Sequence, residues 1–238
     1  MNINKIGVFT SGGDAPGMNA CIRAVVRTAI HHNIPVMGIR RGLQGMIEDD
    51  FITLTSRSVS NIVQRGGTML LSARSKDFMT VEGRQTAYDN LKSHGVDALV
   101  AIGGDGTFRG MMALNETFPD IKIIGIPGTI DNDTYGTDFT LGFDTAVNTA
   151  IDAIDKIRDT ANSHHRLFFV EVMGRNSGWI AIYSGLAGGA EAVLLPEQSD
   201  NIDELINKLK KGSSSGKMSS IVVVAEGEEL GNAVEIAK

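Results

Sequence analysis

Residues 98–107 read ALVAIGGDGT. The first five are small or apolar, which is typical of a strand buried on both faces of a sheet. Two glycines follow at once, and an aspartate and a glycine then lead into residues 107–117, which have helical spacing. A buried strand that runs through glycines into a helix is the repeating unit of α/β proteins. We therefore expect a sheet covered by helices.

The same pattern recurs on both sides of this stretch. Short apolar runs predict further strands at residues 5–10, 36–39, 121–126, 167–172, 192–195 and 221–225. Helical spacing predicts further helices at residues 19–31, 80–94 and 146–158. Gly95 suits a helix C-terminal cap, and Pro127 is expected to stop the strand before it. Uniformly apolar strands that alternate with helices predict a parallel sheet with helices on both faces.

Two polar stretches interrupt this alternation. The long segment 128–140 predicts a change of domain near Gly142. The low-complexity stretch KKGSSSGK, residues 210–217, predicts an exposed loop.

Composition narrows the class of protein. The 238 residues suffice for one large or two small domains, and the net charge of −6 argues against general binding to nucleic acid or to anionic membranes. A single cysteine, Cys21, excludes an intrachain disulfide. No stretch has the length and apolarity of a membrane helix, and the chain begins directly with a strand-like segment. We therefore expect a cytoplasmic enzyme.

Ligands of open α/β sheets bind outside the carboxyl ends of the strands. After the first predicted strand comes SGGDAPGMN, residues 11–19. Its glycines would let the backbone approach a ligand, and the next helix would offer free N–H groups to a phosphate. The alternative is simply a tight turn between strand and helix.

The next strand end carries an isolated carboxylate, Asp105, between glycines. Mg²⁺ suits such a site, because phosphate oxygens of a ligand can complete its coordination. Alternatively Asp105 only caps the helix, although Thr107 could also do so.

Further along the chain, the strand end at residues 127–133 reads PGTIDND. Asp131 and Asp133 are spaced by two, so we expect them to point the same way, one accepting a proton while the other orients it or binds metal. Ordinary turn chemistry is the alternative for each acid taken alone.

The two remaining strand ends supply a cation and another acid. Arg175, in MGRNSG at residues 173–178, could neutralise charge on a transferring phosphoryl group. Glu226 follows the last predicted strand and could bind sugar hydroxyls. Five strand ends thus supply glycines, acids and an arginine, which favours phosphoryl transfer to a neutral hydroxyl.

The segments that carry these residues resemble the phosphofructokinase family across nearly the whole chain. They are TSGGDAPGMN (10–19), RGGT (65–68), SAR (72–74), IGGDGT (102–107), PGTIDND (127–133), GTD (136–138) and VEVMGR (170–175). GGDGT alone also occurs in NAD kinases and lipid kinases, whereas PGTIDND followed by MGR is highly specific.

The resemblance implies two Rossmann-like parallel-sheet sandwich domains with the active site between them. Residues 1–141 would form an incomplete ATP- and Mg²⁺-binding domain, and residues 142–238 a fructose 6-phosphate-binding domain. The implied reaction moves the γ-phosphate of MgATP onto the 1-hydroxyl of fructose 6-phosphate, the committed step of glycolysis.

The resemblance also implies a nucleotide site. Arg74 would bridge the phosphates of ATP, and Asp105 would hold Mg²⁺. The nucleotide residues are Gly12, Arg74, Ser75, Gly104, Asp105, Gly106 and Thr107. Pyrophosphate users of the family tend to have Asp and Lys at the positions of Gly106 and Gly128, so glycine at both favours ATP. An aspartate would crowd and repel the nucleotide α-phosphate, whereas glycine leaves space.

For the sugar, the resemblance makes Asp131 the base, supported by Thr129 and Asp133. Arg175 would stabilise the transferring phosphate, and Arg166 would reach the sugar across a subunit interface of a homotetramer. The substrate residues are Thr129, Asp131, Arg166, Met173, Gly174, Arg175 and Glu226.

An effector site for ADP or phosphoenolpyruvate is implied as well. Its residues are Arg23, Arg27, Arg158, Gly189, Glu191 and Lys217. Ser56, Ser215 and Met218 stand where basic residues are usual, so we expect weaker control by effectors. Arg23 and Arg27 alternatively form only a solvated helix face.

The chain departs from the family pattern at its end. Family members continue past the position of Lys238 with groups that bind the sugar 6-phosphate and with elements that complete the first domain. We therefore expect a fragment with weak sugar binding and an exposed sheet edge. The alternatives are a pyrophosphate-dependent enzyme, a relative of NAD or lipid kinases, and a catalytically impaired nucleotide-binding fragment.

Overall fold

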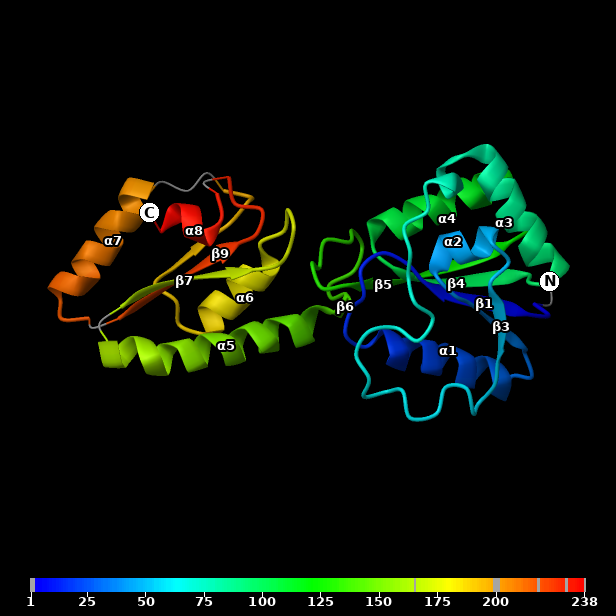
Figure 1. The fold of residues 1–238 in the computed structure, drawn as a ribbon, viewed down its shortest axis with the longest axis horizontal. Coiled ribbons are helices and arrows are strands. Elements are labelled where there is room, and N and C mark those ends of the chain that lie inside the picture. The colour runs from blue at the N-terminus through cyan, green and yellow to red at the C-terminus, as the bar shows by residue number, and fades with distance from the viewer. Residues whose placement is uncertain (1–2, 165, 199–201, 218, 230, 238) are drawn as a thin grey trace. The chain divides into compact units, whose positions relative to one another are not determined.

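The computed structural model describes residues 3–164, 166–198, 202–217, 219–229 and 231–237. The chain divides into two compact units (Figure 1). Unit 1 comprises Met1–Thr129 and Asp133–Gly142, and unit 2 comprises Ile130–Asn132 and Phe143–Lys238.

Unit 1 is built on a six-stranded sheet of order β3-β2-β1-β4-β5-β6. The strands are β1 (Ile6–Thr10), β2 (Val36–Ile39), β3 (Phe51–Leu54), β4 (Ala98–Gly103), β5 (Lys122–Thr129) and β6 (Leu141–Gly142). β1 pairs in parallel with β2 and β4, and β5 in parallel with β4 and β6.

The prediction of an all-parallel sheet is wrong at one edge, because β3 runs antiparallel to β2. Residues 40–50 between these strands contain only the short helix α2 (Gly42–Ile47). A parallel pair needs a crossover of about a dozen residues or more, so a link this short brings the chain back in the opposite direction.

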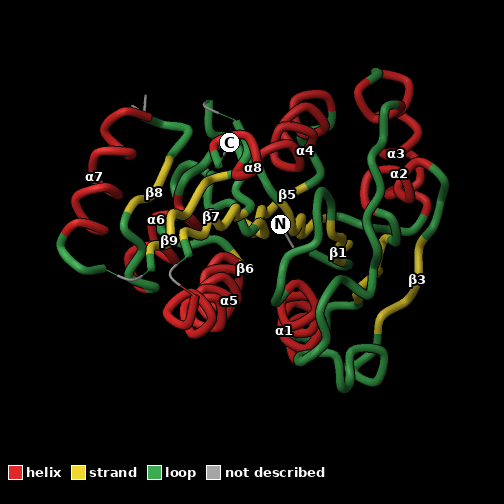
Figure 2. The backbone as a smooth tube through the Cα atoms, turned by 60° about the vertical axis from the view of Figure 1, so that its left-hand side comes forward, coloured by secondary structure: helices red, strands yellow, loops and turns green. Residues whose placement is uncertain are grey.

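Helices cover both faces of this sheet (Figures 1 and 2). α1 (Met18–His31) lies on one face, and α2, α3 (Val81–Ser93) and α4 (Asp105–Thr117) lie on the other. All six residues of β4 are buried, as the run of apolar residues predicts. Phe9 and Leu99 from the strands pack with buried Leu91 of α3 and Leu114 of α4.

Three local predictions in unit 1 have different outcomes. The Thr80 side chain caps α3 by accepting from Gly83 N at 3.0 Å, and Gly95 follows this helix at φ +69°. Thr107 does not cap α4: it lies within the helix, and Gly104 takes the N-cap position. β5 does not stop at Pro127 but continues to Thr129, because a proline is tolerated where one side of a strand lacks a partner.

The outer edge of β5 is exposed. Among the described residues, β6 pairs with it only at Gly128 and Thr129, and 64% of Ile124 is accessible. A hollow of about 270 Å³ beside this strand is lined by Phe108, Met111, Met112, Asn115, Ile123 and Gly125. The expected exposed sheet edge is therefore present at β5.

Unit 2 has a parallel sheet of order β7-β9-β8, formed by β7 (Leu167–Val172), β8 (Ala192–Leu194) and β9 (Ser220–Ala225). α5 (Phe143–His164) and α6 (Trp179–Ala187) lie on one face, and α7 (Ile202–Ser214) and α8 (Ala233–Ile236) on the other (Figure 1). All three strands lie where apolar runs predict them.

The central strand β9 supports both cores of unit 2. Val223 and Ala225 pack with α5 and α6, whereas Val222 and Val224 pack with α7 and α8. This alternation follows the two-residue period of a strand.

The predicted loop at residues 210–217 is wrong in its first part, since α7 continues to Ser214. Leu205 and Leu209 on the same helix face pack into the core of unit 2 and hold the helix on the sheet. Within the described residues, no helix is both long and apolar enough to cross a membrane.

Candidate active site

The carboxyl ends of β1 and β4 meet in unit 1. Ser11 N donates to Ile102 O at 3.0 Å, which ties the turn after β1 to the end of β4. Gly12 in this turn has φ +88°, a conformation that favours glycine. A Cβ on Gly103 would lie 2.6 Å from Ser11 O and 2.4 Å from Thr107 Oγ1. Only glycine at position 103 lets these two strand ends approach so closely.

The next glycines in the chain leave open space at the start of α4. Gly104 has its nearest neighbour at Thr129 Cβ, 3.8 Å from an added Cβ, and an added Cβ on Gly106 would meet no atom within 4 Å. The fold therefore does not require glycine at 106, and the space beside the helix N-terminus is open to an anion.

Gly128 differs from Gly106 in this respect. An added Cβ would lie 3.1 Å from Ile102 Cγ2 and 3.3 Å from Met18 Cε, so packing within unit 1 already favours glycine here. Only Gly106 therefore keeps its value as an indicator of the phosphoryl donor.

Asp105 is the first residue of α4, and its carboxylate forms an ion pair with Arg109 Nε at 2.7 Å. The two side chains are 56% and 78% exposed. A pair this exposed is worth about 0.5 kcal/mol or less, so a metal ion can displace Arg109 at little cost.

The donors around Asp105 fit Mg²⁺ held jointly with a ligand. No cluster of three potential metal-ligating side chains occurs among the described residues. Mg²⁺ is commonly held by one or two carboxylates together with waters and substrate phosphates. The open space at Gly106 gives such phosphates room beside the carboxylate.

The segment that carries Arg74 and Ser75 reaches the turn after β1. Ser72 Oγ donates to Gly12 O at 2.8 Å. Ser75 Oγ accepts from Phe78 N at 3.2 Å, and Arg74 is exposed. The Ser72 contact thus ties the segment that carries Arg74 and Ser75 to the turn at Gly12.

The two acids of residues 127–133 do not share one environment. Asp131 is 7% exposed and belongs to unit 2, whereas Asp133 is exposed and belongs to unit 1. Asn132 between them has φ +52°. The expectation that the two carboxylates point the same way is wrong, because it requires extended backbone at Asn132.

In unit 2, Glu226 is fixed against the turn after β7. Its Oε2 accepts from Gly174 N at 3.4 Å and from Arg175 N at 3.2 Å. The close fit extends to Gly227, where a Cβ would lie 2.0 Å from Arg175 O. Sequence reasoning missed Gly227, although a glycine directly after a candidate acid was a usable signal.

Ser177 joins this turn to Asp131, and sequence reasoning missed it as well. Its Oγ donates to Asp131 O at 2.9 Å, and its N donates to Gly174 O at 2.9 Å. Arg175 has φ +55°, which costs about 1–3 kcal/mol for a residue other than glycine. Unit 2 therefore assembles Asp131, Arg175 and Glu226 around a strained turn, the kind of geometry that is typical of functional sites.

The sequence comparison places this geometry in a family. The family model for phosphofructokinase matches residues 5–238.

The chain belongs to the phosphofructokinase family.

Individual phosphofructokinases agree with the family match. The chain is 56% identical over 236 residues to the ATP-dependent 6-phosphofructokinase of Cytophaga hutchinsonii, covering 99% of this chain and 72% of that one. It is 58% identical over 231 residues to ATP-dependent 6-phosphofructokinase 1 of Thermus thermophilus, covering 97% and 71%. The phosphofructokinase structure from Saccharomyces cerevisiae has a TM-score of 0.94 at 36% identity; the match covers 98% of this chain and 36% of that one.

Arg166 lies apart from the other phosphofructokinase substrate positions of this chain. Arg166 directly precedes β7, whereas Met173 directly follows this strand. The six residues of β7 span roughly 20 Å. Arg166 is exposed at that opposite end of the strand. Within one chain, the structure does not bring Arg166 to Glu226.

Most effector positions implied by the phosphofructokinase resemblance have partners within their own units. Arg23 Nη1 donates to Val59 O at 2.6 Å, and Arg27 is exposed on the same helix. Arg158 donates to Gly188 O and Gly189 O, which end α6. Glu191 pairs with Lys217.

The prediction about missing cations in this region concerns three positions. Ser56 is half-buried, Ser215 is exposed, and Met218 lies outside the described residues.

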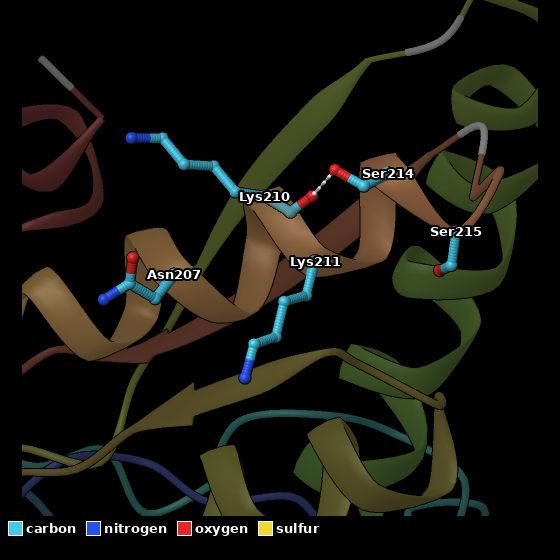
Figure 3. Close-up of a pocket in the computed structure, with 5 residues that line it drawn as sticks. All are labelled: Asn207, Lys210, Lys211, Ser214 and Ser215. Atoms are coloured by element: carbon cyan, nitrogen blue, oxygen red, sulfur yellow. Dashed lines mark hydrogen bonds between the residues drawn. The ribbon is translucent and has the colours of Figure 1, made fainter.

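A hollow on the surface of α7 is lined by residues outside the predicted site (Figure 3). It measures about 590 Å³ and is lined by Asn207, Lys210, Lys211, Ser214 and Ser215. The ammonium groups of Lys210 and Lys211 point in different directions, and Ser214 donates back to Lys210 O at 2.9 Å (Figure 3). This surface of one helix therefore offers no converging set of ligand groups.

Proposed function

We propose that this chain carries the activity of an ATP-dependent 6-phosphofructokinase, transferring the γ-phosphoryl group of MgATP to the 1-hydroxyl of fructose 6-phosphate. Its sequence similarity to enzymes of that name supports the proposal. The observation that carries it in the structure is the joining of Asp131 to the turn of Arg175 through Ser177.

In this proposal unit 1 binds the nucleotide. Arg74 contacts the phosphates, and the backbone at Gly12, Gly104 and Gly106 allows them to approach closely, with Ser75 and Thr107 lining the site. Mg²⁺ held by Asp105 would supply positive charge that neutralises the phosphate oxygens. Open space at Gly106 supports ATP over pyrophosphate as the donor.

Unit 2 supplies the sugar site and the groups for chemistry. Asp131 takes the proton of the attacking hydroxyl, because a carboxylate within reach of that hydroxyl can act as general base. Arg175 stabilises charge on the transferring phosphoryl group. Glu226, Met173 and Gly174 contact the sugar, and Thr129 and Asp133 belong to the same catalytic set in this proposal.

The enzyme acts as a homotetramer in this proposal, so that Arg166 of one copy reaches the sugar bound to another. The exposed apolar residues of α6 support association. Trp179, Tyr183 and Leu186 are 44%, 42% and 81% exposed, and their spacing places them along one side of the helix. Size-exclusion chromatography with light scattering checks the mass, and a monomer at micromolar concentration would contradict this assembly.

Effector control belongs to the same proposal, with ADP or phosphoenolpyruvate as ligand. Arg158 donates to Gly189 O and Lys217 pairs with Glu191, so a phosphate must compete with these partners for the two cations. This requirement supports weak effector control. A sigmoidal fructose 6-phosphate curve that ADP strongly relieves would contradict it.

A coupled assay for fructose 1,6-bisphosphate tests the main proposal, with MgATP and then pyrophosphate as donor. Product with MgATP alone is the expected result. If product forms with pyrophosphate but not with MgATP, the phosphoryl donor is pyrophosphate and not ATP. A parallel titration of MgATP by calorimetry distinguishes a chain that binds nucleotide without turnover from one that does not bind it, and the former outcome would indicate an impaired nucleotide-binding fragment.

A further inference from the structure

Residues 65–75 connect two parts of unit 1 without forming a helix or strand of their own. The segment carries Arg74 and Ser75, which the proposed function assigns to the nucleotide. An irregular segment can place a charged side chain only if contacts with rigid elements fix its backbone. Two buried polar side chains, Thr10 at the end of β1 and Asn19 at the start of α1, provide such contacts.

Asn19 is 3% exposed and bonds to the segment three times. Its Nδ2 donates to Arg65 O at 3.0 Å and to Gly66 O at 3.2 Å, and its Oδ1 accepts from Met69 N at 2.7 Å. Both amide hydrogens and an acceptor site are thereby used.

The helix itself gives no reason for an asparagine at this position. The N-cap of α1 is Gly17, so Asn19 lies inside the helix, where asparagine is a poor helix former. Its side chain therefore serves the segment rather than the helix.

Thr10 bonds to the same segment through a second threonine. Thr10 Oγ1 donates to Leu71 O at 2.9 Å and lies 2.8 Å from Thr68 Oγ1. A hydroxyl has one hydrogen, so Thr10 must accept from Thr68, which in turn accepts from Leu70 N at 3.3 Å. Thr10 is fully buried, and loss of its hydroxyl would leave Leu71 O without this donor.

We propose that Asn19 and Thr10 are positioning residues that fix the backbone of residues 65–72 and thereby hold Arg74 for the phosphates of the nucleotide. The inference rests on the proposed function, because it assumes that Arg74 meets a nucleotide. The bond from Ser72 to Gly12 continues the same connection as far as the turn after β1.

The test compares Asn19→Ala with Asn90→Ala. Asn90 is a matched control in unit 1: its Nδ2 donates to Met46 O at 3.0 Å and to Ile47 O at 2.9 Å, but it joins α3 to α2. Each variant loses side-chain bonds to backbone carbonyls, and only one of them loosens residues 65–72. Two readouts are measured, hydrogen exchange of the amides in residues 65–75 and the steady-state constants for MgATP.

For Asn19→Ala we expect faster exchange across residues 65–72 and a KM for MgATP raised about tenfold, with kcat changed less than about threefold, since a misplaced binding group acts mainly on ground-state affinity. Asn90→Ala should change neither readout. A general loss of stability would move both variants alike.

Equal exchange in the two variants would overturn the proposal whatever the kinetics show. Faster exchange with an unchanged KM for MgATP would refute the positioning role. If the unsubstituted chain neither binds nor uses MgATP, the proposed function fails, and the exchange comparison still decides whether the two residues fix the segment.

A second pair of variants serves if Asn19→Ala does not fold. Thr10→Ser keeps the hydroxyl and should preserve slow exchange at Leu71 and the KM for MgATP. Thr10→Val removes the hydroxyl, so exchange at Leu71 should become faster and the KM for MgATP should rise. Identical behaviour of Thr10→Ser and Thr10→Val would overturn the proposal.

Discussion

The strand ends of the two units are built differently. In unit 1 the carboxyl ends of the strands are lined by backbone, with open space at Gly106 and an exposed acid, Asp105, in a surface ion pair with Arg109. In unit 2 the polar groups are already fixed, because Glu226 accepts two backbone N–H groups and Ser177 bonds to Asp131 O. The strand ends of unit 1 suit a ligand that brings its own charge and metal. Those of unit 2 suit chemistry that needs preorganised groups.

The sharpest test of this contrast is Asp131→Ser in unit 2. Loss of the general base should lower kcat by roughly 10²–10⁴-fold and leave MgATP affinity unchanged. Fructose 1,6-bisphosphate formation and a calorimetric titration measure the two effects. Asp89→Ser on α3 is the control, because this exposed acid lies outside the proposed site. Near-normal turnover of Asp131→Ser would show that another group removes the proton.

Two glycine substitutions separate packing from ligand space in unit 1. Gly103→Ala should destabilise the protein by about 2 kcal/mol or more, because its Cβ would collide with Ser11 O and Thr107 Oγ1. Thermal unfolding measures this loss.

Gly106→Ala should instead leave stability unchanged or raise it by up to about 1 kcal/mol, since Gly106 is helical and its surroundings are open. The same substitution should weaken MgATP binding, because the methyl group occupies space meant for the ligand. Unaltered affinity for MgATP would remove Gly106 from the nucleotide site.

A smaller effect is expected at Cys21 on α1. Burial raises the pKa of its thiol, so the folded protein holds less thiolate at a given pH than an exposed cysteine does. Alkylation by iodoacetamide at pH 8 should be slower in the folded chain than in urea. The alkylation rate should also increase with pH, and the midpoint of this increase should lie at a higher pH in the folded chain than in urea. Equal alkylation rates in the folded and unfolded chain would contradict the prediction.

The smallest effect is expected for Arg109→Ala. Removal of an exposed partner should strengthen Mg²⁺-dependent nucleotide binding by a factor of about two at most. A titration of MgATP at fixed ionic strength measures it, with Arg84→Ala as a control on α3. A loss of affinity would mean that Arg109 itself contacts the nucleotide.

Apolar runs predicted the strands of both cores well, because a strand covered on both faces must be apolar along its whole length. The same rule could not find β3, whose residues 51–53 are only partly buried or exposed. It also placed the end of β5 too early, because Pro127 occupies a strand edge where its missing N–H is tolerated.

The candidate site was partly predictable for a related reason. Acids and an arginine directly after strands stand out in a sequence, so Asp105, Arg175 and Glu226 could be identified. Ser177 and Gly227 could not, because their roles depend on contacts with Asp131 and Arg175 that only the fold creates. The exposure difference between Asp131 and Asp133 likewise depends on the backbone at Asn132.

The strand order of unit 2 governs how this unit can be made. β7 and β8 each pair with β9, which follows both of them in the sequence. On the ribosome, the two earlier strands therefore wait with unsatisfied backbone groups until residue 225 has emerged, and such edges invite intermolecular pairing. Once β9 inserts, both of its neighbours and both cores gain their central partner together, so the sheet of unit 2 should form in a single cooperative step that waits for β9.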